Sequence, residues 1–196
     1  MIALYLEELF HNDSTFFVGV TELENKFKHT KDQLLEFTGS HLDDIMAIQF
    51  LDSSLIVDEM HIISASQNAI NAWNGEYAIS RSLGLEIAVY ASAQKQIGKA
   101  LDTLGVKDGL ERIALVVVSK SRPALVECIN ALVPKIGEEA VEIFKIDEER
   151  LAKLVKYYEI STKEIETLTL SKEIEILQDA ISRCVRSRVS LVAIES

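Results

Sequence analysis

The chain is poor in the residues that cross-link, stiffen or break a backbone. Its 196 residues include two cysteines, two prolines and eight glycines. Cys128 and Cys184 stand apart in apolar surroundings without the paired spacing of a zinc site, so we expect core thiols in a reduced compartment. The few glycines and prolines, together with 48% hydrophobic residues, argue against long disordered segments and predict a buried core.

Membrane and secretory signals are also lacking. The longest uninterrupted apolar runs are six residues, as in Ile113–Val118, against the roughly 20 that a membrane span needs. The first ten residues contain Glu7 and Glu8 but no basic residue, which is not the pattern of a signal peptide. We therefore expect a cytoplasmic protein that has no membrane partner.

No catalytic sequence motif is present. The chain has no glycine-rich phosphate loop, no G-x-S-x-G, no H-E-x-x-H and no C-x-x-C. Its histidines are scattered singly, at His11, His29, His41 and His61. We expect no catalytic residue, bound metal or cofactor, although a triad assembled from distant residues stays open.

The negative charge is concentrated in two parts of the chain. The net charge is −11, with 3 basic and 10 acidic residues in 1–57 and 6 basic against 12 acidic in 136–180. Residues 58–135 hold eight of each sign, and 181–196 hold three basic residues and one acidic. Any surface for an anion is therefore expected in the middle of the chain or at its C-terminal end.

The hydrophobic patterns predict one α+β (mixed α/β) domain over residues 1–196, with a small central sheet of short strands flanked by helices. A hairpin is expected around Asn12-Asp13, and Thr30 with Gln33 and Ser161 with Glu164 resemble capping boxes. Further strands are expected at residues 55–57, 85–92 and 113–119, with a short strand or a loop at 138–145. Helices are expected up to residue 39 and at residues 40–51, 60–73, 93–104, 123–134 and 151–158, then after Ser161 and after Ser171.

The helix expected at residues 60–73 has two unlike faces. A core-facing stripe is predicted for Ile62, Ser66, Ala69, Ile70 and Trp73. The opposite stripe is polar but uncharged and consists of Ser64, Gln67, Asn68, Asn71 and Asn74. Such a face suits contact with a polar ligand or a protein, and an ordinary hydrated helix face is the alternative.

A phosphate site is one hypothesis for the basic residues that follow. Arg81 lies in the linker before the expected strand, and Lys95 and Lys99 are spaced i, i+4 on the next expected helix, with Ser92 as its cap. The free N–H groups of a helix start and these cations together can hold phosphate. Three solvated charges are the alternative.

The last helix carries an apolar face wider than one stripe, which suits a docking surface or ordinary packing. That face consists of Ile174, Ile176, Leu177, Ala180, Ile181, Cys184, Val185 and Val189.

Five short motifs in the same order, over almost the whole chain, resemble the CGI-121/TPRKB family. They are Leu9-Phe10 before Thr15–Val20, Ile56–Asp58 before the amide-rich helix, Arg81–Ile87, Leu101–Val106 and Asp179–Cys184. The resemblance is to archaeal-type members of this family, the small kinase-associated subunit of the KEOPS (EKC) complex.

The resemblance implies a non-catalytic role in tRNA modification. In KEOPS another subunit transfers a threonylcarbamoyl group to a tRNA adenosine. The CGI-121-type subunit binds the N-terminal lobe of the small atypical kinase/ATPase and is implicated in capturing the single-stranded 3′ CCA end of tRNA. The implied partners are therefore that kinase and tRNA, with no cofactor and no small-molecule substrate.

Candidate residues follow from combining this resemblance with the patterns above. Expected RNA contacts are Asn68, Asn71, Arg81, Ser82, Lys95 and Lys99. Expected kinase contacts are the apolar anchors Ile181, Val185 and Val189, with Arg186 and Arg188 at the rim. Two alternatives stay open: these apolar side chains pack inside the domain, or the protein activates the kinase without touching RNA.

Overall fold

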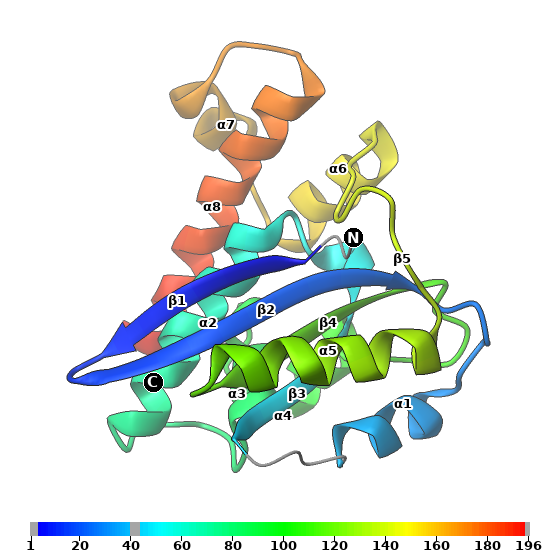
Figure 1. Ribbon diagram of the computed structural model, residues 1–196. Coiled ribbons are helices and arrows are strands. Elements are labelled where there is room, and N and C mark those ends of the chain that lie inside the picture. The colour runs from blue at the N-terminus through cyan, green and yellow to red at the C-terminus, as the bar shows by residue number, and fades with distance from the viewer. Residues whose placement is uncertain (1–3, 40–43, 195–196) are drawn as a thin grey trace.

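A single antiparallel sheet organises the chain. The computed structural model describes residues 4–39 and 44–194, with four strands in the order β1-β2-β4-β3 and β5 paired to β2 (Figure 1). The strands are β1 (Tyr5–His11), β2 (Ser14–Glu24), β3 (Ile45–Asp52), β4 (Arg112–Ser119) and β5 (Glu138–Glu139).

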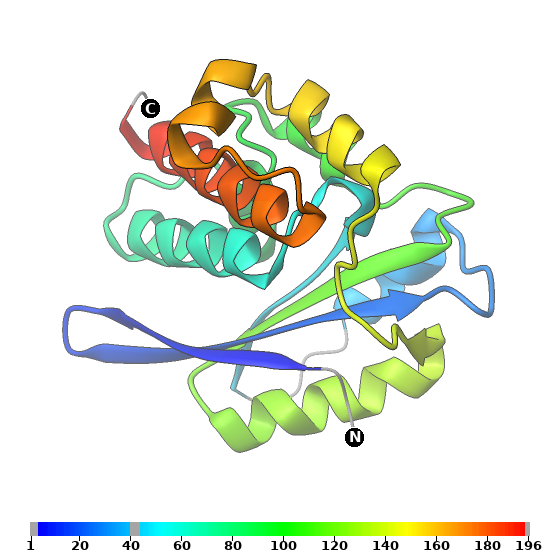
Figure 2. The same cartoon turned by 90° about the horizontal axis from the view of Figure 1, so that it is seen from above.

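Helices cover both faces of this sheet (Figures 1 and 2). Helices α1 and α5 pack on one face, while α2, α3 and α8 lie over the other, with α8 on the far side of α2. The helices are α1 (Lys31–Thr38), the 3-10 turn η1 (Ser53–Leu55), α2 (Glu59–Asn74), α3 (Leu83–Ala91), α4 (Ile97–Leu104), α5 (Arg122–Ile136), α6 (Glu148–Tyr157), α7 (Thr162–Leu168) and α8 (Ile174–Ile194). This single α+β domain confirms the predicted fold class.

Strand β4 lies between two hydrophobic cores. Alternate residues point to opposite faces of a strand, so each core receives every second side chain. The α1–α5 side takes Ile113, Leu115 and Val117, and the α2–α3 side takes Ala114, Val116 and Val118. Because both faces are covered, the strand is apolar without interruption, and the strand predicted at residues 113–119 is confirmed.

Several local predictions are also confirmed. The hairpin turns at Asn12-Asp13, with Asn12 in the left-handed region at φ 50°. Both capping boxes form, at Thr30 for α1 and at Ser161 for α7. Helix α5 begins with Pro123 in its first turn, where the missing N–H costs no hydrogen bond.

The strand predicted at residues 85–92 is wrong, because this segment is α3. Eight of its nine residues are buried, so its apolar pattern has no helical periodicity. Helix α4 also starts later than predicted, at Ile97. Trp73, predicted in the core, is 36% exposed at the end of α2.

Two further predictions, just before α2, are wrong. In place of the helix expected at residues 40–51, residues 45–52 form β3, while 40–43 lie outside the described residues. Strand β3 contributes side chains to both cores, so it too is apolar on both faces. The expected strand at 55–57 is replaced by the 3-10 turn η1 and an extended residue, Ile56.

Candidate functional site

The amide stripe of α2 binds the tip of the β1–β2 hairpin. The Gln67 Nε2 donates to the Phe10 carbonyl and to the Asn71 Oδ1, both at 3.0 Å. The same Asn71 oxygen lies 3.1 Å from His11 Nδ1, and Asn68 Nδ2 donates to the Ser64 carbonyl at 2.9 Å. Asn71 is therefore engaged with the hairpin, whereas Asn68 binds only the carbonyl one turn earlier on its own helix.

The N-terminus of α3 presents Arg81 and Ser82 to solvent. Ser82 caps the helix, its hydroxyl accepting the Leu85 N–H at 3.3 Å, and both residues are exposed. Within the described part of the chain, the Arg81 side chain makes no ion pair. A cation beside the positive end of a helix forms a surface that favours anions.

Glu86 fixes the backbone that leads into this helix. Its buried carboxylate accepts the Ile79 N–H at 3.1 Å and the Ser80 N–H at 2.7 Å, while the Ser80 hydroxyl donates to the Ser82 carbonyl at 2.8 Å. These bonds order an otherwise irregular segment on either side of Arg81. The sequence signal for this role is a single acidic residue inside the apolar segment 83–91.

A groove, here called the α1–α3 groove, borders Ser82. It has a volume of about 530 Å³ and is walled by α1, β3, α3 and α4. Its apolar lining includes Leu35, Met46, Leu85 and Leu101, and its polar lining includes Lys31, Gln49 and Ser82. A concave apolar surface with a few polar groups can hold a flat organic ring such as a nucleotide base.

Lys95 and Lys99 are not on one helical face, because Lys95 precedes α4. Ser92, predicted to cap that helix, instead caps the C-terminus of α3 and is buried. Lys95 lines a separate groove of about 320 Å³ together with Tyr157 and Arg188. Lys99 is exposed on α4. The structure thus separates the predicted RNA contacts: Asn68 and Asn71 lie on α2, Lys95 lines the groove beside Arg188, and Arg81 and Ser82 lie at the start of α3.

The apolar side chains predicted to anchor a kinase lie inside the domain. Ile181, Val185 and Val189 are each 0% exposed and belong to the core under α2. This is the packing alternative left open by the sequence, and it removes them as surface anchors. The reason is that α8 packs along α2, and a helix packed in this way needs an apolar face toward its neighbour.

The two arginines predicted at the rim of that interface have different surroundings. Arg188 is largely enclosed, because its guanidinium donates to the carbonyls of Cys184 and Glu159 and to the Glu164 carboxylate at 2.9 Å. This contact and hydrogen bonds from Ser161 lower the pKa of Glu164 to about 2, the Ser161 backbone bond contributing most. Arg186 is half-buried on α8. Their role at a partner interface stays a prediction.

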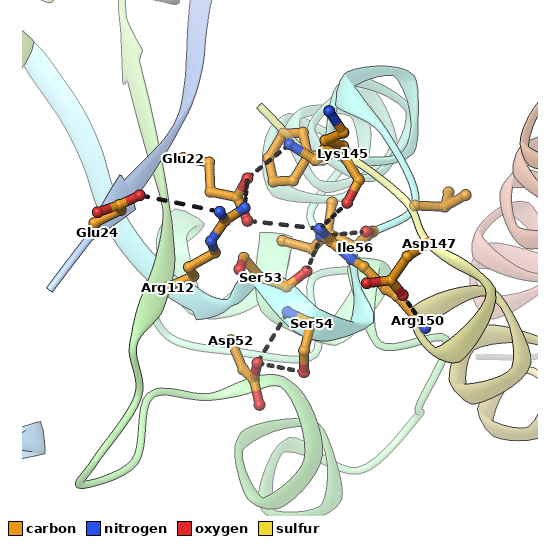
Figure 3. Close-up of polar contacts among 12 residues, drawn as sticks. Glu22, Glu24, Asp52, Ser53, Ser54, Ile56, Arg112, Lys145, Asp147 and Arg150 are labelled. Carbon is orange, nitrogen blue, oxygen red and sulfur yellow. Dashed lines mark hydrogen bonds and ion pairs between the residues drawn. The ribbon is translucent and has the colours of Figure 1, made fainter. Parts of the chain in front are cut away.

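A buried ion-pair network joins α6 to the sheet (Figure 3). Glu22, 0% exposed on β2, lies with Oε1 3.7 Å from Arg150 Nη1 and Oε2 3.6 Å from Arg112 Nη1. Arg150 also donates to the carbonyls of Ser53, Ile56 and Lys145. The sequence gives no signal for this pairing, since the partners are far apart along the chain. The Arg150 Nη1 and Nη2 groups thus bind carbonyls of the fold, whereas its buried Nε has no hydrogen-bond partner among the described residues.

His61 is buried beneath α3 and kept neutral. Its Nε2 lies 2.9 Å from the Ala91 carbonyl and must donate to it, so Nδ1 carries no proton and has no hydrogen-bond partner among the described residues. Burial lowers the pKa of His61 to about 4. Its ring also lies edge-on to Tyr158, with centroids 5.6 Å apart, so its contacts are those of a packed side chain.

Two other kinds of feature are absent from the described residues. Among the residues that the structure describes, no group of three or more His, Cys, Asp or Glu side chains could hold a metal ion. No helix in residues 4–39 and 44–194 is long and apolar enough to cross a membrane.

One protein-family model matches most of this chain. The family model described as kinase binding protein CGI-121 matches residues 20–192. No curated protein matches the chain. The match includes the end of β2, strands β3, β4 and β5, the α2–α3 unit, the α1–α3 groove and most of α8, while β1 lies outside it. The chain therefore belongs to the CGI-121 family of kinase binding proteins.

Proposed function

We propose that this protein is a non-catalytic, cytoplasmic subunit of the KEOPS complex that binds the complex's small atypical kinase/ATPase and recruits tRNA through its 3′ CCA end. Membership of a kinase-binding family supports the kinase contact. The observation that carries the tRNA contact is the exposed N-terminus of α3, with Arg81 and Ser82, beside the α1–α3 groove.

This arrangement suits a single-stranded RNA end. A single strand is held mainly through its bases, by stacking and hydrogen bonds, and needs only modest positive charge. The groove offers an apolar lining for a base, and the helix N-terminus with Arg81 offers a site for a phosphate. Such a local surface allows RNA binding by a protein whose net charge is −11.

The proposed RNA contact includes fewer residues than the six predicted from the sequence. Arg81 and Ser82 form its centre, and Lys99 flanks it on α4, whose Leu101 lines the same groove. Asn68 and Asn71 are omitted because their side chains bind within the domain. Lys95 is omitted because it lines the groove beside Arg188.

For the kinase we propose the outward face of α8, on the side away from α2 (Figure 2). Ile176 is 40% exposed there, and Arg183 and Ser187 are exposed further along the helix. An exposed apolar side chain with charged neighbours is the usual composition of a protein interface. Replacing Arg183 by glutamate should weaken kinase binding without changing tRNA binding.

The decisive measurement is binding of this protein to intact tRNA and to tRNA trimmed of its CCA end, at one fixed salt concentration. Trimming and Arg81→Glu should each weaken binding several-fold. The matched control is Lys163→Glu, which makes the same charge change on α7 and should leave tRNA binding within twofold of the unmodified protein.

A regulatory module that activates the kinase without touching RNA is the second candidate, favoured by the acidic net charge. It predicts that neither trimming nor Arg81→Glu changes tRNA binding, while Arg183→Glu still weakens the kinase complex. Those results together would replace the tRNA-recruiting proposal.

A further inference from the structure

The loop between β2 and α1 interleaves aromatic and basic residues. Residues 25–31 read Asn-Lys-Phe-Lys-His-Thr-Lys, and they contain all three basic residues of the first 57 positions. The rest of residues 1–57 hold ten acidic residues and no basic one. This local concentration of cations is therefore not a consequence of composition.

Buried Asn25 fixes the shape of this loop. Its side chain, 6% exposed, accepts the His29 N–H at 2.9 Å and donates to the carbonyls of His29 and Leu110 at 3.1 and 3.0 Å. Its carbonyl accepts the Lys28 N–H at 3.0 Å, and Lys28 adopts a left-handed φ of 53°. The backbone polar groups thus turn inward, which leaves the side chains of residues 26–28 facing solvent.

Phe27 projects from this fixed loop and is 62% exposed. The ring of His29 lies edge-on to it, with centroids 5.8 Å apart, and edge-on to Phe37 at 5.4 Å. His29 is itself held, because its Nε2 donates to the Lys135 carbonyl at 2.8 Å. One side of Phe27 therefore contacts the His29 ring, which Phe37 and the Lys135 carbonyl hold in place, so a new contact would immobilise few additional rotatable bonds.

The lysines around Phe27 differ in whether their amines are already paired with carboxylates. Lys26 is neutralised by Glu24 at 2.8 Å and by Glu138 at 3.5 Å, and its hydrogen bond to Glu24 raises the pKa of the amine. The amines of Lys28 and Lys31 make no ion pair among residues 4–39 and 44–194. The His29–Lys135 contact brings a further exposed lysine to the same corner.

This corner is continuous with the RNA contact proposed above. Lys31 and Ser82 line the same groove, the α1–α3 groove, from opposite walls. On its other side, Lys28 lines a groove of about 620 Å³ together with Arg112. A strand that lies across the α1–α3 groove would therefore reach the loop at Lys31.

We infer that the β2–α1 loop is a second RNA-binding surface, on which an unpaired base stacks on Phe27 while Lys28 and Lys31 contact neighbouring phosphates. The inference extends the proposed tRNA-recruiting function to a second contact on the same RNA. An exposed ring bordered by lysines matches the surfaces that bind single strands by stacking and charge. Base–aromatic stacking is sequence-tolerant, so this contact would add affinity without selecting particular bases.

The test uses a short oligouridine, which has no CCA end, and the full-length protein. Phe27→Ala should weaken oligouridine binding roughly 5- to 100-fold, and Phe27→Trp should retain it, because stacking needs only an aromatic face. Lys28→Gln should reduce the dependence of log affinity on log salt by about 0.7. The matched control is Phe10→Ala, which removes a ring of similar exposure, 59%, from the hairpin.

The outcomes separate this inference from the proposed function. Unchanged oligouridine binding in Phe27→Ala and Lys28→Gln, or no binding of oligouridine to the unmodified protein, would overturn the inference. If CCA trimming still weakens tRNA binding in that case, the tRNA-recruiting function stands without this surface. Loss of kinase binding in Phe27→Ala with unchanged oligouridine affinity would assign the loop to a protein partner and also overturn the inference.

Discussion

Replacing Arg150 by methionine should lower the free energy of unfolding by about 3 kcal/mol. The substitution keeps most of the apolar stem and removes only the guanidinium. The Arg150 side chain is 12% exposed, and its Nη1 lies 3.7 Å from the Oε1 of fully buried Glu22. It also donates to the Ser53 carbonyl of η1 and to the Ile56 carbonyl at 3.0 Å, so one side chain fastens α6 to the sheet and to the segment before α2.

The magnitude follows from what remains around Glu22 after the change. Removing one partner of a buried ion pair typically costs 3–5 kcal/mol, because the other charge stays in a poorly solvated site. Here the loss is partly offset, since Arg112 lies 3.6 Å from the other carboxylate oxygen and the Phe144 N–H donates to it at 2.7 Å. The lower end of that range is therefore expected.

Urea unfolding followed by circular dichroism would measure this cost. The control is Lys153→Met, which removes an exposed cation from the same helix and should change stability by less than about 0.5 kcal/mol. Adding Glu22→Gln to Arg150→Met should recover part of the loss, because no unpaired charge then stays buried. A cost below about 1 kcal/mol for Arg150→Met, or strictly additive effects, would refute the reasoning.

Three further predictions concern the core and the edge of the sheet. Val185→Asp should destabilise the domain by at least about 3 kcal/mol in urea unfolding, whereas Ser187→Asp on the exposed side of α8 should not; an unchanged midpoint for the first would contradict its burial. The pKa of His61 is lowered to about 4 from 6.5, so below pH 6.5 the unfolded chain binds a proton that the folded protein does not, until about pH 4. Stability should therefore fall by about 2 kcal/mol between pH 7 and pH 5, and this loss should be absent in His61→Gln. Gly137→Ala should lower the melting temperature and break the β2–β5 pairing, since a Cβ there would lie 1.9 Å from the Glu24 carbonyl oxygen; a melting temperature equal to that of the unmodified protein would show that this contact relaxes freely.

The sequence alone determined the features whose signals lie within a few residues. Thr30 and Ser161 form capping boxes because each meets a side chain three positions later, and the Asn12-Asp13 turn depends on one left-handed residue. The strand at 113–119 was also predictable, since its β-branched residues favour a strand and its polar ends bound it. The α+β fold class was predictable too, from the hydrophobic patterns of the whole chain.

Tertiary structure decided the elements that are buried on all sides. A segment covered by protein on every face has no periodic pattern, so the segment at 83–91 was compatible with a strand and the one at 45–52 with a helix. Only their neighbours distinguish them: β3 pairs with β4, while Ser82 caps α3 and its Glu86 binds the preceding loop.

The candidate site was predictable as a region but not as a set of contacts. Arg81 and Ser82 were identified because their place before an expected element is a local property. Whether Asn71 faces solvent depends on His11, 60 residues earlier, and whether Val185 faces a partner depends on α2. Composition and spacing determine which side chains are available, whereas long-range packing decides which are already bound within the domain and which remain exposed on its surface.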